Sequence, residues 1–218
     1  MKPIDEVLQS TARALGQSLE RVFADLAVLA GATTDILAAP GTSRTKPESL
    51  RPVVDDIVTG QAGLVDSAGV SVTPGLFSDA GAWHQAPASI NYYDYTEMTW
   101  YERPLASGQP ELIGPYIDFG GADMKIVTAS LPVLQEKRAV AVAGADLSME
   151  SIERTFLLNL GRRDEHVALI TETGKVVASN SARFAPGTRF EGPRSRSGSV
   201  PVPVADLASP PWHLIADR

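Results

Sequence analysis

Apolar residues recur with a three-four alternation through the first 40 residues, and polar residues fill the positions between them. This spacing gives a helix one narrow apolar face, so it predicts a single long helix from Ile4 to about Leu37, ended by Pro40 and Gly41. The apolar face suits both covering a sheet of the same chain and pairing with the same helix of a second subunit. Its members are Leu8, Ala12, Leu15, Leu19, Val22, Leu26 and Leu29.

Short apolar stretches separated by turn residues come next, and they are typical of strands. The polar residues 135–137 join two such stretches, which predicts an antiparallel hairpin. A helix should follow it, with Ser148 as the N-cap and Gly161 as the end. Glycine and proline interrupt residues 73–90, which we expect to be irregular. The other expected elements are a helix at 48–60, a hairpin at about 62–72 and strands at 112–119, 125–134 and 138–147.

The pattern then restarts, because "HVALITETGKVVAS" at 166–179 echoes the hairpin expected at 62–72. The echo predicts two sheet units in tandem, of which the second is smaller. Helices and strands do not alternate regularly, so the fold class should be α+β with antiparallel sheets. The expected parts are a helix at 1–40, a first unit at 41–160 and a second unit at 161–218.

Composition removes several classes of function. A net charge of −7 disfavours a nucleic-acid surface, and the lack of cysteine excludes disulfides and thiolate metal sites. The three histidines lie in unrelated settings, and no nucleophile elbow or phosphate loop is present. We therefore expect no enzyme, no metal and no cofactor. No apolar run reaches the roughly 20 residues that span a bilayer, so the chain as written should be soluble.

Four of the chain's five tyrosines and one of its three tryptophans fall in "YYDYTEMTWYERP" at 92–104, together with carboxylates. Such residues can simply fill a core. Aromatic faces next to carboxylates also suit an ammonium group, through cation–π contact and ion pairing. This composition indicates a small binding pocket with a few orienting polar groups.

Three motifs then connect the chain to a known family. They are Trp-Tyr at 100–101, Pro-Tyr-Ile-Asp at 115–118 and Gly-Ala-Asp-Leu at 144–147, the last directly before a helix. In this order, and with the long first helix and the weaker second unit, the chain resembles double Cache sensor domains. The resemblance implies two PAS-like units, a ligand in the first unit and a long helix that pairs two subunits.

A subset of that family binds amino acids, and its pattern implies the site residues. Carried over by position, they are Tyr93, Trp100, Tyr101, Tyr116, Asp118 and Asp146, with Met98 where the family has an arginine. In the family the arginine grips the ligand carboxylate, while tyrosines and aspartates hold the amino group. The chain thus keeps the amine half of the pattern. Arg103 or Lys125 could replace the missing cation from elsewhere.

The expected function is a small-molecule sensor domain of a bacterial signalling system that binds an amine or an amino-acid derivative. The alternative is a non-catalytic dimerisation module with a vestigial pocket, its aromatics serving as core. The expected partners are this ligand and a second copy of the chain. Localisation stays open between a free-standing cytoplasmic protein and a fragment of an extracytoplasmic sensor.

Overall fold

The structure is a computed structural model that describes residues 2–38, 72–78, 81–84, 95–118, 124–191, 199–205, 207 and 210–217. The helices are α1 (Ile4–Ala38), α3 (Thr99–Ser107) and α4 (Met149–Leu160). The strands are β1 (Val72–Ser78), β2 (Gly81–His84), β3 (Glu111–Ile117), β4 (Lys125–Gln135), β5 (Arg138–Ser148), β6 (His166–Thr171), β7 (Val176–Ser179), β8 (Ser199–Pro201) and β9 (Trp212–Asp217).

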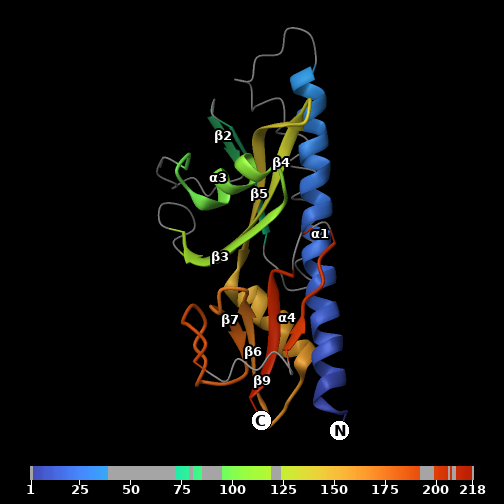
Figure 1. Cartoon of the computed structure of the whole chain (residues 1–218), viewed down its shortest axis with the longest axis vertical. Coiled ribbons are helices and arrows are strands. Elements are labelled where there is room, and N and C mark those ends of the chain that lie inside the picture. Colours follow the sequence, from blue (N-terminus) through green and yellow to red (C-terminus); the bar gives the residue numbers. More distant parts are fainter. Residues whose placement is uncertain are drawn as a thin grey trace.

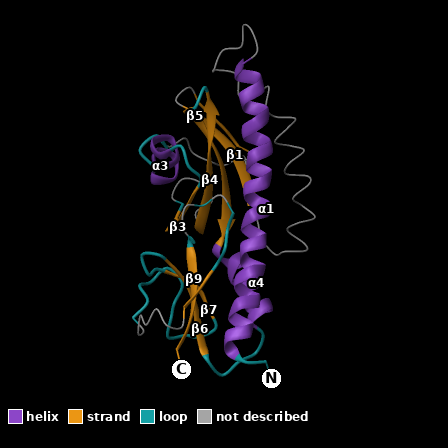
Figure 2. Ribbon diagram, turned by 45° about the vertical axis from the view of Figure 1, so that its right-hand side comes forward, coloured by secondary structure: helices purple, strands orange, loops and turns teal. Residues whose placement is uncertain are grey.

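The strands form two antiparallel sheets, one above the other along the length of the molecule (Figure 1). The first has the order β2-β1-β5-β4-β3, and the second has the order β7-β6-β9-β8. Helix α1 lies beside both sheets, and α4 lies beside the lower part of α1 (Figure 2). The α+β class, the long first helix and the two tandem units are therefore confirmed.

The apolar seam of α1 is buried inside its own chain. All seven members predicted from the three-four alternation are at most 4% exposed. They join one core cluster with residues of β4, β5, α4 and the second sheet. The seam therefore covers sheets of its own chain. The alternative expectation, that these seven residues pair with a second subunit, is wrong.

Helix α1 also touches the second unit through backbone. A side chain at Gly16 would collide with the carbonyl oxygen of Pro203, so glycine permits this close approach. One turn later, Glu20 Oε1 accepts a hydrogen bond of 3.1 Å from the Ala205 N–H. The same helix therefore holds both units.

The β4–β5 hairpin and the start of α4 follow the sequence prediction. Glu136 and Lys137 have φ angles of 50° and 68°, as the tight turn between two antiparallel strands requires. The side chain of Ser148 accepts a hydrogen bond from the Ser151 N–H, and Gly161 closes the helix. The predicted N-cap and end of α4 are confirmed.

Two expectations between residues 73 and 107 were incomplete. Residues 73–90 are not irregular throughout, because β1 and β2 pair with each other and β1 pairs with β5. Helix α3 was not foreseen within the aromatic stretch. The helix expected at 48–60 and most of the hairpin expected at 62–72 lie outside the described residues, and the boundaries of the two units stay predictions.

The first sheet has two different faces. Val127, Ala129 and Ala145 belong to the core cluster under α1. Val142 instead packs with aromatic side chains on the α3 side. Because side chains alternate along a strand, even-numbered positions of β4 and of this part of β5 face α3. That face carries the site described below.

Burial of the seam predicts a sharp contrast between two neighbouring positions of α1. Leu26 is 1% exposed and Val28 is 58% exposed. Leu26→Ala should lower the free energy of unfolding by about 2–5 kcal/mol, because it leaves a cavity in the core. Val28→Ala, the matched control, should change it by no more than about 0.5 kcal/mol. Urea unfolding measures both, and equal small losses would contradict the packing described here.

Candidate functional site

An aromatic cluster lies on the α3 face of the first sheet. Tyr95, Trp100 and Tyr101 are 5–6% exposed and pack against Val142 of β5. The Tyr95 and Tyr101 rings meet edge to face with centroids 5.2 Å apart, and Tyr95 stacks on Trp100 at 6.0 Å. The cluster therefore forms a rigid aromatic wall above the sheet.

Helix α3 sets the orientation of two of these rings. Met98 precedes the helix with extended backbone, and its carbonyl oxygen accepts hydrogen bonds from the N–H groups of Tyr101 and Glu102. Gly108 ends it with a φ of 65°, the left-handed conformation that glycine tolerates best. Trp100 and Tyr101 thus fall in the first turn, facing the sheet, whereas Met98 is 38% exposed at the helix start.

A chain of hydrogen bonds crosses three strands on the same face. The Tyr116 and Thr128 hydroxyl oxygens are 2.5 Å apart, and the Thr128 hydroxyl donates to Asp146 Oδ1 at 2.8 Å. Thr128 and Asp146 are direct partners in the β4–β5 register. Since the Thr128 proton goes to the carboxylate, the Tyr116 hydroxyl donates to Thr128 when Asp146 is ionised.

Asp146 holds its proton unusually tightly. Burial raises the pKa of this carboxyl from 3.8 to about 7, the Thr128 hydrogen bond lowers it, and the negative charge of Asp118 raises it again. Asp118 follows β3 and is 7% exposed, and its N–H donates to the Met124 carbonyl at 3.0 Å. Two carboxyls on one face of a sheet are therefore close enough to repel each other when both are charged.

The predicted site residues fall into two groups. Tyr116, Asp118 and Asp146 interact directly or through Thr128, and Trp100 and Tyr101 are in mutual contact. Both groups lie on the α3 face. Met98 is near the start of α3, with its side chain partly in solvent. Tyr93 lies outside the described residues.

The two substitute cations are occupied elsewhere. Arg103 pairs with Glu111 at 2.9 Å, and the Lys125 ammonium donates to the Pro186 carbonyl of the second unit at 3.2 Å. Both cations are thus engaged with other groups of the protein, and replacement of the family arginine by either of them stays a prediction. Asp146 takes no part in capping α4, because Ser148 does this.

Sequence reasoning missed Tyr95 and Thr128. Tyr95 lies in the quoted aromatic stretch, but the family pattern pointed to Tyr93 instead. Thr128 gave a signal of its own, as a polar residue in the middle of a strand that is otherwise buried on both faces. Its partners become evident only once the strand register is known.

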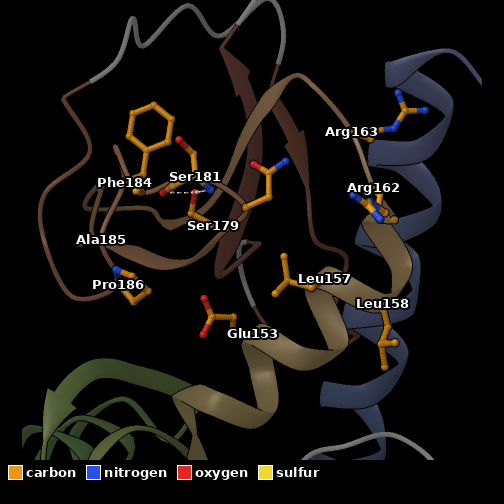
Figure 3. Close-up of a pocket in the computed structure, with 13 residues that line it drawn as sticks. Glu153, Leu157, Leu158, Arg162, Arg163, Ser179, Ser181, Phe184, Ala185 and Pro186 are labelled. Carbon is orange, nitrogen blue, oxygen red and sulfur yellow. Dashed lines mark hydrogen bonds between the residues drawn. The ribbon is translucent and has the colours of Figure 1, made fainter.

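A separate groove of about 780 Å³ lies between the last turns of α4 and the loop after β7 (Figure 3). Leu157 and Leu158 form one side, and residues 179–186 form the other. Its polar groups are largely engaged with the protein itself, because Ser179 donates to the Val167 carbonyl and Arg163 donates to the Lys2 carbonyl. The groove therefore offers mainly exposed apolar surface.

Within the described residues, no cluster of histidine, aspartate or glutamate could hold a metal ion. In the same part of the chain, no helix combines the length and the apolar character that crossing a bilayer requires.

Residues 71–154 match the family model of methyl-accepting chemotaxis protein-like proteins, first PDC sensor domain. Among curated proteins, none matches the sequence. Solved structures do resemble the chain. The ligand-binding domain of the Pseudomonas fluorescens chemoreceptor CtaA, in complex with L-valine, is 17% identical with a TM-score of 0.67, covering 97% of this chain and 93% of that one.

Two further structures come from Pseudomonas aeruginosa PAO1. The ligand-binding domain of the amino-acid chemoreceptor PctC with GABA is 17% identical with a TM-score of 0.65, over 96% of both chains. That of PctB with L-Arg is 17% identical with a TM-score of 0.67, over 96% of this chain and 90% of that one. The chain has the Cache/PDC fold of these ligand-binding domains. The resemblance drawn from the motifs at 100–101, 115–118 and 144–147 is thereby confirmed.

The Cache/PDC fold here contains a carboxyl whose titration must affect stability. Asp146 binds its proton more tightly in the folded chain, with a pKa of about 7, than in the unfolded chain, where an aspartate has its ordinary pKa of 3.8. The folded protein therefore carries the extra proton between these pH values, and its free energy of unfolding falls as pH rises from about 4 to 7. Above pH 7 the loss is complete.

Asp146→Asn should remove this decline and leave the protein more stable than the parent at pH 8, by on the order of a few kcal/mol. Urea unfolding from pH 4 to 8 measures it, with Asp164→Asn, at an exposed aspartate, as the control. Parallel pH profiles for Asp146→Asn and the parent would contradict the raised pKa.

Proposed function

We propose that this chain is a non-catalytic small-molecule sensor domain of a bacterial signalling system, and that its first unit binds an amine-bearing ligand. The observation that carries the proposal is the pair Asp118 and Asp146 on one sheet face beside a wall of aromatic rings. An ammonium group satisfies both features, because it neutralises carboxylates and is attracted to aromatic faces.

The state of Asp146 supports a cation rather than an anion as the ligand's main group. A buried carboxyl without a counter-charge is still about half protonated at pH 7, as its pKa of about 7 implies. A bound ammonium would restore the ionised form by offsetting both the burial and the Asp118 charge. The energy gained is available only when the ligand is present, so binding can shift a conformational equilibrium.

The similar structures point to the same ligand class. The domains of CtaA, PctC and PctB are described in complex with L-valine, GABA and L-Arg, and each of these ligands carries an amino group. Each also carries a carboxylate. In this chain Met98 stands where the family pattern has its arginine, and a thioether cannot neutralise a carboxylate. We therefore propose amines without a carboxylate as the preferred ligands.

The proposed contacts are Trp100, Tyr101, Tyr116, Asp118 and Asp146, together with Tyr93 and with Met98 at the edge. They belong to the proposed first unit at 41–160, with 1–40 as the supporting helix and 161–218 as the second unit.

A homodimer through α1 also remains part of the proposal, but it would use the outward face of the helix, where Val28 is exposed. Sedimentation of Val28→Glu tests this, since a folded protein that still dimerises would exclude that face.

A dimerisation module with a vestigial pocket is the rival function. Its main support was the apolar seam of α1, and the chain itself covers that seam. A thermal-shift screen of amines, amino acids and carboxylates separates the two functions, because a ligand that binds only the folded state raises its stability. No shift across the panel would favour the rival.

Binding of an ammonium ligand should depend on pH through Asp146. The ligand stays protonated at pH 6 and 8, whereas Asp146 with a pKa of about 7 is mostly protonated at the lower value and mostly ionised at the higher. Affinity should therefore be about tenfold weaker at pH 6 than at pH 8. Titration calorimetry measures this, and a pH-independent affinity would exclude Asp146 as the counter-charge.

Asp146→Ala tests the same contact by deletion. It removes a buried, charge-assisted hydrogen bond, so amine affinity at pH 8 should fall roughly ten- to a hundredfold while the protein stays folded. Asp164→Ala is the control at an exposed carboxylate and should bind like the parent. Unchanged affinity in a folded Asp146→Ala protein would remove this residue from the site.

Met98→Arg tests the proposal that the preferred ligand lacks a carboxylate. The new guanidinium should weaken amine binding through charge repulsion, by about tenfold, and should favour an α-amino acid over the amine of the same side chain. Leu134→Arg adds the same charge at a position of similar exposure, 42%, and should change neither affinity. If the unmodified protein already prefers the α-amino acid, the amine assignment is wrong although the sensor function survives.

A further inference from the structure

One buried hydroxyl on the α3 face of the first sheet has no partner. Ser130 of β4 is 0% exposed, and its side-chain oxygen makes no hydrogen bond. Among the described residues, only Thr11 and one oxygen of Glu165 share this property. A buried polar group without a partner is costly, so such groups are rare in folded proteins and call for a physical explanation.

The position of Ser130 places it in the candidate site. It lies two residues after Thr128 on the same strand, so both side chains point to the same face. Thr128 is the residue that links Tyr116 to Asp146. Ser130 is thus the next position of that face along β4.

Two glycines continue the row that Ser130 begins across the sheet. The direct partner of Ser130 on β5 is Gly144, and the partner of Gly144 on β1 is Gly75. Glycine has no side chain, so Ser130, Gly144 and Gly75 form a stripe across β4, β5 and β1 in which only Ser130 carries a side chain. Close packing alone would not place a hydroxyl without a hydrogen-bond partner at one end of this stripe.

This stripe lies between the two halves of the site. On one side, Thr128 pairs with Asp146 in the strand register. On the other side, Pro132 pairs with Val142, which carries the cluster of Trp100 and Tyr101. A ligand whose ammonium contacts Asp146 and whose body extends toward the aromatic rings passes over Gly144, directly beside Ser130.

We propose that the Ser130 hydroxyl hydrogen-bonds to a second, uncharged polar group of the ligand, which makes the ligand a short amino alcohol or amino amide. This inference rests on the proposed binding of an amine in the first unit. It assigns Ser130 as a specificity-determining residue, which recognises what lies beyond the ammonium.

The charges around Ser130 explain why the second polar group of the ligand should be uncharged. Arg103 pairs with Glu111, Lys125 donates to Pro186, and Lys175 donates to the Pro115 carbonyl at 3.4 Å. Glu111 is the register partner of Ser130 on β3, so the Arg103–Glu111 pair lies beside Ser130 with its positive charge already balanced. A carboxylate above Ser130 would therefore meet this neutral pair and the Asp146 carboxyl, and none of the three cations would be available to balance it. A hydroxyl or an amide exchanges a hydrogen bond with serine and needs no counter-charge.

The strand geometry sets the length of the ligand. Asp146 and Ser130 lie on neighbouring strands and are offset by two residues, about 7 Å along the strands. Hydrogen bonds of about 2.8 Å that rise obliquely from the sheet shorten this span only in part, so the ligand's nitrogen and its second polar group should be roughly 3–6 Å apart. A spacer of about two to four carbons between the nitrogen and the second polar group meets both contacts. Longer spacers would push the second group past Ser130 into the aromatic cluster.

The test compares two amines that have equal numbers of heavy atoms, 3-aminopropan-1-ol and n-butylamine, by titration calorimetry at pH 8. The parent should bind the amino alcohol about five- to tenfold more tightly, the usual value of one added hydrogen bond. Ser130→Ala should abolish this preference and leave n-butylamine affinity within about twofold of the parent.

Thr11→Val is the matched control, because it removes another buried, unpartnered hydroxyl, on α1. Both variants relieve an unsatisfied polar group in the ligand-free protein, so both should raise the Tm by roughly 2–4 °C. Only Ser130→Ala should change the preference between the two amines. A purely structural Ser130 would shift the Tm and leave the preference intact.

Two results would overturn the assignment of Ser130 while amine binding stands. One is a parent that binds both amines equally, and the other is a Ser130→Ala protein that keeps the preference or loses affinity for both amines alike. If neither amine binds the parent at all, the proposed function itself is overturned, and the role of Ser130 falls with it.

Discussion

A helix of 35 residues with an apolar seam along one side is stable only if that seam is buried, and the rest of the molecule is arranged to cover it. Neither sheet is long enough to do this alone. The first sheet covers the upper part of α1, while α4 and the second sheet cover the lower part (Figure 2). One continuous apolar cluster therefore runs through both units, and neither unit has a complete core without the helix.

The same constraint separates packing from recognition in the first sheet. The odd-numbered residues of β4, such as Val127 and Ala129, are committed to the core under α1. The even-numbered residues are free to be polar, which is where Thr128 and Ser130 occur. A slip of one residue would place Asp146 in the apolar core, so the two-residue turn at Glu136 and Lys137 protects the site as well as the fold.

The features of the fold that could be predicted from the sequence were mostly local ones. The alternation in α1, the tight turn of the β4–β5 hairpin and the cap at Ser148 each depend on residues close together in the chain. Strand β1 escaped prediction because Pro74 and Gly75 are read as breakers, yet they pair with Ala145 and Gly144 in the middle of a sheet. Family resemblance supplied Asp118 and Asp146, whereas Thr128 and Ser130 required a register that only the three-dimensional arrangement contains.

Strand β5 passes into α4 without an intervening loop, since one ends at Ser148 and the other begins at Met149. Asp146 lies only two residues before this junction. Hinges need residues that can absorb a change in backbone angles, and here there is no slack to do so. A displacement of Asp146 would therefore be passed directly to α4, the helix that packs against α1 and the second sheet.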